Sequence, residues 1–109
     1  MRDTVKIDKR GVRLIAHRGL SGIEQENTCA AFIAAANRES YYGIETDVYR
    51  TSDGKYVLHH DDRVCTGAYI PETDFDTLRA VVMEDKDGRE RWDLRVPTLD
   101  EYVRICKNY

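Results

Sequence analysis

Three short, mostly apolar segments constrain this chain most, because each has the length and composition of a buried β-strand. They cover residues 12–16, 44–50 and 56–60. Between the first two, an alanine-rich stretch predicts a helix that runs to about Glu39 and has Asn27 or Thr28 as its N-cap. Strands that alternate with helices predict an α/β architecture with a parallel sheet.

Weaker sequence signals predict a turn and two helices in the rest of the chain. Residues 52–54 (SDG) predict a turn between the second and third strands. A short helix that begins at Thr73 as its cap is expected over residues 74–82. Thr98 and Glu101 have the spacing of a capping box at the start of a last helix. Four side chains of that last helix are predicted to face inward: Leu99, Tyr102, Val103 and Cys106.

The length of the chain limits how many of these elements can form a complete fold. Its 109 residues contain no linker-like stretch, so residues 1–109 are expected to belong to one domain. Three strands cannot close a barrel, and a (β/α)8 barrel needs about 250 residues. We therefore expect this chain to form the first part of a larger architecture.

The composition excludes several classes of protein. The chain has 20 acidic and 17 basic residues and no cluster of Lys and Arg, which argues against nucleic-acid binding. No apolar stretch approaches the roughly 20 residues that span a bilayer, and no targeting or anchor signal is evident, so a cytoplasmic location is expected. The three cysteines lack the spacing of a zinc site or a disulfide framework, which predicts reduced thiols.

Two carboxylates lie two residues apart in the second predicted strand. In a regular strand, Glu45 and Asp47 project from the same face, where like charges repel unless a cation holds them. Carboxylate oxygens suit Mg²⁺ or Ca²⁺ better than a soft metal. We therefore expect a divalent cation as cofactor.

Two histidines lie at the ends of the first and third predicted strands. The imidazoles of His17 and His60 can act as a general acid and a general base near neutral pH. Arg18, beside His17, offers a fork of donors that matches a phosphate group. Because β/α barrels place their sites at the carboxyl ends of the strands, these residues together indicate phosphoester chemistry.

Five motifs carry a resemblance to a known family. They are LIAHRG (14–19), ENT (26–28), IETDV (44–48), SDGKYVLHHDD (52–62) and VPTLDE (96–101). Over roughly residues 11–107 the chain resembles the glycerophosphodiester phosphodiesterases. The resemblance implies the N-terminal portion of a TIM-like (β/α)8 barrel that hydrolyses a glycerophosphodiester to glycerol 3-phosphate and an alcohol.

The resemblance also implies roles for individual residues. His17 and His60 would be the acid/base pair, Arg18 would bind the substrate phosphate, and Glu45 and Asp47 would ligate the divalent cation, Mg²⁺ or Ca²⁺.

Three other residues of these motifs receive supporting roles. Glu26 is expected to support the site loop. Asp61 either orients a neighbouring group, begins the next loop or caps a helix. His59 would face away from the site, because successive side chains of a strand alternate between its two faces.

The chain departs from the family pattern in two places. The segment DRVCTGAYI (62–70) lacks the arginine of the family's Arg-Thr-Thr stretch, and the third metal carboxylate would come from a strand beyond Tyr109. Two carboxylates would hold a divalent ion weakly, and three strands leave an open sheet edge. We therefore expect the 109-residue chain alone to be inactive or nearly so, and to self-associate or bind a partner through that edge.

Other functions fit the same residues. A non-catalytic remnant or interaction module would keep the fold without turnover, and a phosphate-binding module would use Arg18 and the carboxylates without hydrolysis. A sphingomyelinase-type lipase would share much of the motif pattern, so the head group stays open. The enzyme is favoured because buried like charges cost stability and have no structural reason to persist.

Overall fold

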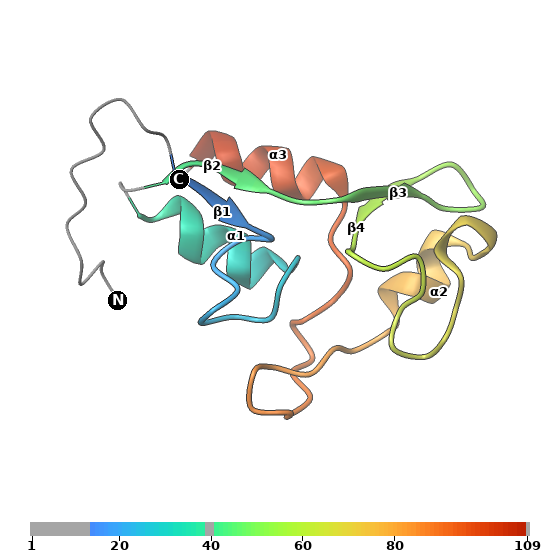
Figure 1. The fold of residues 1–109 in the computed structure, drawn as a ribbon. Helices are drawn as coiled ribbons and strands as arrows, with labels where there is room; N and C mark the ends of the chain where they lie inside the picture. The colour runs from blue at the N-terminus through green and yellow to red at the C-terminus, as the bar shows by residue number, and fades with distance from the viewer. Residues whose placement is uncertain (1–13, 39–40, 109) are drawn as a thin grey trace.

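A computed structural model describes residues 14–38 and 41–108 of the chain. In chain order its elements are β1 (Leu14–His17), α1 (Cys29–Ala36), β2 (Tyr41–Glu45), β3 (Val48–Arg50), β4 (Tyr56–Leu58), the 3-10 turn η1 (Ile70–Glu72), α2 (Phe75–Arg79) and α3 (Leu99–Asn108). The helices α1 and α3 pack against one another beside the strands, and α2 lies near the β3–β4 end of the molecule (Figure 1). The predicted strand start at Val12 and helix end at Glu39 lie outside the described residues.

The first two strands form the parallel pair that the alternating pattern predicts. β1 pairs with β2 in a register that places His17 opposite Glu45. After β1 the chain turns at Gly19, whose φ is 82° and where an added Cβ would lie 2.7 Å from the backbone carbon of Ala31. Only glycine fits there, so the loop after β1 can lie directly against α1.

The second predicted strand is interrupted, and this corrects the expected sheet. Residues 46 and 47 separate β2 from β3, which pairs antiparallel with β4 rather than extending a parallel sheet. β3 and β4 are antiparallel because only the short turn at Gly54, whose φ is 83°, joins them. Parallel strands need a crossover of a dozen or more residues. The described strands thus form two two-stranded sheets, and no closed barrel exists within residues 14–38 and 41–108.

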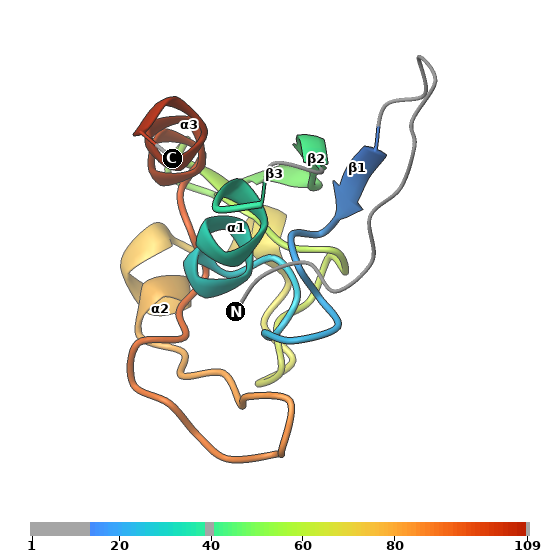
Figure 2. The ribbon, with the colours of Figure 1, turned by 90° about the vertical axis from the view of Figure 1, so that its left-hand side faces the viewer.

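The helix α3 begins at the predicted capping box and packs on α1. Thr98 Oγ1 accepts from the Glu101 N–H at 3.1 Å, and the Glu101 carboxylate accepts from the Thr98 N–H at 2.9 Å. Tyr102 meets Phe32 edge to face, with ring centroids 5.2 Å apart. These contacts join α1, α3 and β2 through one apolar cluster. Figure 2 shows the two helices end-on beside β2.

The predicted inward face of α3 is partly wrong. Leu99 and Tyr102 contact the core, whereas Val103 and Cys106 are exposed and Ile105 is buried in their place. The apolar stripe of α3 is therefore rotated toward Ile105, because the helix packs on α1 and β4.

A second apolar cluster lies under β4 and α2. It contains buried Val57, Ile70, Leu78 and Val96. The helix α2 is shorter than the predicted span of 74–82, and Asp74 rather than Thr73 caps it by accepting from the Thr77 N–H at 3.1 Å. The Thr73 hydroxyl instead donates to the carbonyl of Tyr69. This hydrogen bond closes the η1 turn before α2 begins.

Of the helices in the described part of the chain, none combines the length and the apolar character that a membrane crossing requires.

Candidate active site

The carboxyl ends of β1 and β2 bring three of the predicted site residues together. His17 Nε2 lies 3.6 Å from Glu45 Oε2, and the same oxygen accepts from the Arg18 N–H at 3.1 Å. This contact follows from the parallel register, since His17 and Glu45 are the last paired positions of the two strands. The imidazole of His17 is 66% exposed and can reach a ligand from solvent.

The guanidinium of Arg18 is held by an ion pair that the sequence did not reveal. Arg18 Nη1 donates to both carboxylate oxygens of Glu26, at 3.1 and 2.9 Å. The pairing agrees with the prediction that Glu26 supports the site loop, and it identifies Arg18 as the group supported. Arg18 has a φ of 58°, and its Nε is buried without a hydrogen-bond partner.

Asn27 connects the loop after β1 to the residues after β2. Its backbone N–H donates to the Arg18 carbonyl at 2.9 Å, and its Oδ1 accepts from the Thr46 hydroxyl at 2.8 Å. The N-cap of α1 is Thr28, which accepts from the Ala31 N–H at 3.2 Å. Of the two candidate caps, Thr28 is therefore correct, and Asn27 instead ties two site loops together.

The two predicted metal carboxylates occupy different local settings. Glu45 is the last residue of β2, whereas Asp47 lies between β2 and β3, where its carbonyl accepts from the His59 N–H at 3.1 Å. Alternation along one strand therefore does not determine the direction of Asp47. Both groups offer the hard oxygen atoms that Mg²⁺ or Ca²⁺ prefers, but the described residues contain no group of three His, Cys, Asp or Glu side chains able to hold a metal.

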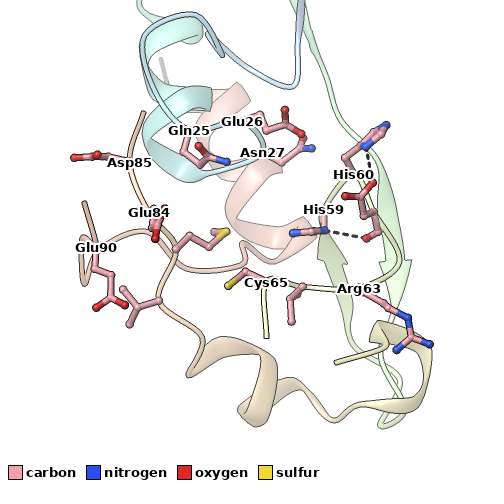
Figure 3. A pocket seen from close by; sticks show the side chains of 14 residues that line it. Gln25, Glu26, Asn27, His59, His60, Arg63, Cys65, Glu84, Asp85 and Glu90 are labelled. Atoms are coloured by element: carbon pink, nitrogen blue, oxygen red, sulfur yellow. Dashed lines mark hydrogen bonds and ion pairs between the residues drawn. The ribbon is translucent and has the colours of Figure 1, made fainter. Parts of the chain in front are cut away.

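His60 follows β4 and lines an open pocket of about 730 Å³. Its Nδ1 lies 3.0 Å from Asp61 Oδ1, so Asp61 is placed to orient the ring, which is one of the alternative roles expected for it. His59 lines the same pocket, because β4 ends at Leu58 and strand alternation no longer separates the two histidines. Figure 3 shows Glu26 and Asn27 at the start of α1 and the two histidines at the end of β4.

The predicted residues thus form two neighbouring groups. His17, Arg18 and Glu45 meet at the ends of β1 and β2, and His60 lines the pocket. Two contacts link the groups, the ion pair between Arg18 and Glu26 and the hydrogen bond from the His59 N–H to Asp47.

Tyr49 is a site neighbour that sequence reasoning missed. Its hydroxyl donates to the His60 carbonyl at 3.0 Å, and removal from water raises its pKa, with Asp62 as the next cause. Tyrosine is common in β-strands, so Tyr49 gives no sign of a site role in the sequence. The contact becomes evident only from the pairing of β3 with β4.

Cys29 has the environment of a structural thiol. Burial raises its pKa to about 11, and the charge of Glu101 acts in the same direction. The reactive thiolate is therefore strongly disfavoured. All three cysteines are unpaired in the structure.

Two histidines, an arginine and two carboxylates along the strand ends of a partial β/α barrel are typical of hydrolases that act on phosphate esters. The chain belongs to the glycerophosphoryl diester phosphodiesterase family, whose sequence profile matches residues 17–108.

Individual relatives agree with this assignment. YhdW of Bacillus subtilis is 51% identical over 95 residues, which cover 84% of this chain and 39% of YhdW. The glycerophosphodiester phosphodiesterase of Caldanaerobacter subterraneus is 37% identical over 96 residues, again 84% of this chain and 39% of the relative.

A solved structure supports the fold. An Oleispira antarctica phosphodiesterase, in complex with the product sn-glycerol-3-phosphate, aligns with a TM-score of 0.72 and 29% identity over 89% of this chain and 40% of that one. The chain thus spans about two fifths of the length of these proteins, and its strands correspond to part of their TIM-like barrel.

Proposed function

We propose that this chain supplies the histidines, the arginine and two carboxylates of a site that hydrolyses glycerophosphodiesters to glycerol 3-phosphate and an alcohol. The observation that carries the proposal is the meeting of His17, Arg18 and Glu45 at the carboxyl ends of the parallel strands. The family of the chain and the glycerol 3-phosphate held by the Oleispira phosphodiesterase support the substrate class.

The histidines would move the protons of the reaction. Hydrolysis breaks one P–O ester bond, so one proton leaves the attacking nucleophile and one proton goes to the departing alkoxide. One imidazole accepts the first and the other donates the second. For His60, the contact between Nδ1 and Asp61 leaves Nε2 as the nitrogen available to substrate.

Arg18 would bind the phosphate while Glu26 holds its side chain in place. Glu26 contacts Nη1 alone, so Nε remains as a donor for an anionic oxygen. A guanidinium restrained in this way loses less conformational entropy when the substrate binds.

Glu45 and Asp47 would hold a divalent cation, Mg²⁺ or Ca²⁺. Such an ion supplies polarisation of a phosphoryl oxygen and offsets charge that develops in the transition state. Hard cations take six or more oxygen ligands, so two carboxylates give only a partial set. On this basis we propose that the 109-residue chain alone hydrolyses its substrate slowly or not at all.

A chimera tests the proposed function with a complete barrel. The segment of the Caldanaerobacter enzyme that matches this chain is replaced by the corresponding residues of this chain, and glycerol 3-phosphate release from glycerophosphocholine is measured. We expect hydrolysis by the chimera and a loss of about 100-fold or more on His60→Ala.

The histidine variant also separates the alternatives. A folded chimera that binds glycerol 3-phosphate but does not hydrolyse the diester, with or without His60, would favour the phosphate-binding module. A chimera that neither binds nor hydrolyses would favour the non-catalytic remnant.

A further inference from the structure

The side chain of Asn27 is buried and carries a donor with no acceptor. Asn27 is 2% exposed, its Oδ1 accepts from Thr46, and its Nδ2 has no hydrogen-bond partner. A buried amide nitrogen without an acceptor is unfavourable unless something other than the protein satisfies it. This orphan donor therefore points to a ligand.

A second buried donor without a partner belongs to Arg18, which is hydrogen-bonded to Asn27 through the backbone. The Nε of Arg18 is also buried without a partner, and the Arg18 carbonyl accepts from the Asn27 N–H at 2.9 Å. Among the described side chains, these two nitrogens are the buried polar atoms that lack a partner, and both are donors. A ligand that satisfies either nitrogen must offer an acceptor atom, as the oxygens of a phosphoryl group do.

The position of Asn27 gives such a ligand access. Asn27 lines the pocket together with Glu26 from the start of α1, and His60 lines it from the segment after β4 (Figure 3). A φ of 52° places Asn27 in the left-handed region, which asparagine tolerates better than most residues. Asn27 thus belongs to the lining of the pocket, with its Oδ1 held by Thr46 and its Nδ2 buried without a partner.

We propose that the Asn27 side-chain amide donates a hydrogen bond to a phosphoryl oxygen of the ligand held between the loop after β1 and His60. The inference rests on the proposed function and adds a phosphate-contacting residue to it. Asn27 thereby acts in two ways, because its Oδ1 orders the loop at Thr46 while its Nδ2 contacts the ligand.

The test exchanges the donor for an acceptor of the same shape. Asn27→Asp keeps an oxygen for Thr46 and tolerates the positive φ, but it places a carboxylate where the donor was. Asn37→Asp, on an exposed residue at the other end of α1, adds the same charge as a matched control. Binding of inorganic phosphate and of sn-glycerol 3-phosphate to the 109-residue chain is measured by calorimetry.

We expect Asn27→Asp to weaken binding of both phosphate probes by at least tenfold and Asn37→Asp to leave it unchanged. Binding by Asn27→Asp at the affinity of the unmodified chain would overturn the inference and leave the proposed function intact. Failure of the unmodified chain to bind either probe would count against both the inference and the proposed phosphate site.

A second measurement needs no folded variant. In the unmodified chain, the side-chain amide resonances of Asn27 should shift when either phosphate probe is added, and should not shift with glycerol. A shift with glycerol alone would identify a hydroxyl acceptor and overturn the inference. Resonances that stay in place while the probes bind would overturn it as well.

Discussion

The carboxylate of Glu45 lies 3.6 Å from the imidazole Nε2 of His17, across the last paired positions of β1 and β2. Hydrogen bonding between the strands determines this contact, because the parallel register sets which residue of β2 faces the end of β1. The same carboxylate accepts from the Arg18 N–H, so one side chain fixes the start of the loop that carries the arginine. The geometry of the site therefore depends on the pairing of the first two strands.

The turn after β1 should be intolerant of any side chain. Gly19→Ala combines a positive φ with a contact of 2.7 Å to the backbone of Ala31, and we expect a loss of about 2–4 kcal/mol in the free energy of unfolding. Gly22→Ala in the same loop meets no atom within 4 Å and should have a much smaller effect. Urea unfolding measures both, and equal losses would contradict the packing described for the loop.

Acid should weaken the connection between α2 and α3. Arg79 Nη2 donates to Glu101 at 2.9 Å, and this ion pair is the main reason that the pKa of Glu101 is held below its usual range. A lowered pKa in the folded state stabilises the protein above the pKa of the unfolded chain, and this contribution is lost as the pH falls through the folded-state value.

The size of this effect follows from the partial exposure of the pair. Glu101→Gln should cost about 1 kcal/mol at neutral pH and less in acid. Glu72→Gln, at an exposed position of η1, is the matched control. Thermal melts between pH 3 and pH 7 that give the same difference at every pH would contradict the assignment.

Cys29 should react more slowly than the other two thiols. A pKa of about 11, against an ordinary value of 9.0, leaves roughly 100-fold less thiolate at neutral pH. Cys65 and Cys106 are exposed and should be alkylated first by iodoacetamide. Peptide mass spectrometry at timed intervals gives the three rates, and modification of Cys29 as fast as Cys65 would contradict the burial.

The edges of the β1–β2 sheet should promote self-association of the 109-residue chain. Within the described residues each strand of this sheet has one partner, and Ile15 and Tyr42 on it are 51% and 64% exposed. We expect light scattering to give a mass that rises with protein concentration, and Ile15→Lys to lower it. Val103→Lys on α3 is the control, and a monomer at every concentration would refute the prediction.

The sequence predicted the parts of the fold that depend on local signals. The parallel β1–β2 pair, the capping box at Thr98 and the turn at Gly54 are all confirmed. The antiparallel β3–β4 hairpin could have been predicted from the sequence, because a short Asp-Gly turn joins antiparallel strands. The break at residues 46 and 47 could not have been predicted, since every residue from 44 to 50 is acceptable in a strand.

The contacts inside the site depend on backbone geometry that no periodicity reports. The Arg18–Glu26 ion pair forms because the chain turns through Arg18 and Gly19 with positive φ before it returns at Glu26. Asn27 resembles a helix cap in sequence, and its contact with Thr46 requires two loops that lie 19 positions apart. Motifs identify the residue types of such a site, but only the packed loops show which of them touch.

The most direct test of the central claim is to locate a bound cation. Mn²⁺, a paramagnetic substitute for Mg²⁺ or Ca²⁺, is titrated into the ¹⁵N-labelled chain while the amide resonances are recorded. We expect selective broadening at His17, Arg18, Glu45 and Asp47, which Glu45→Gln abolishes and Glu72→Gln preserves. Broadening centred instead on the acidic loop at residues 84–90, or unaffected by Glu45→Gln, would contradict the account.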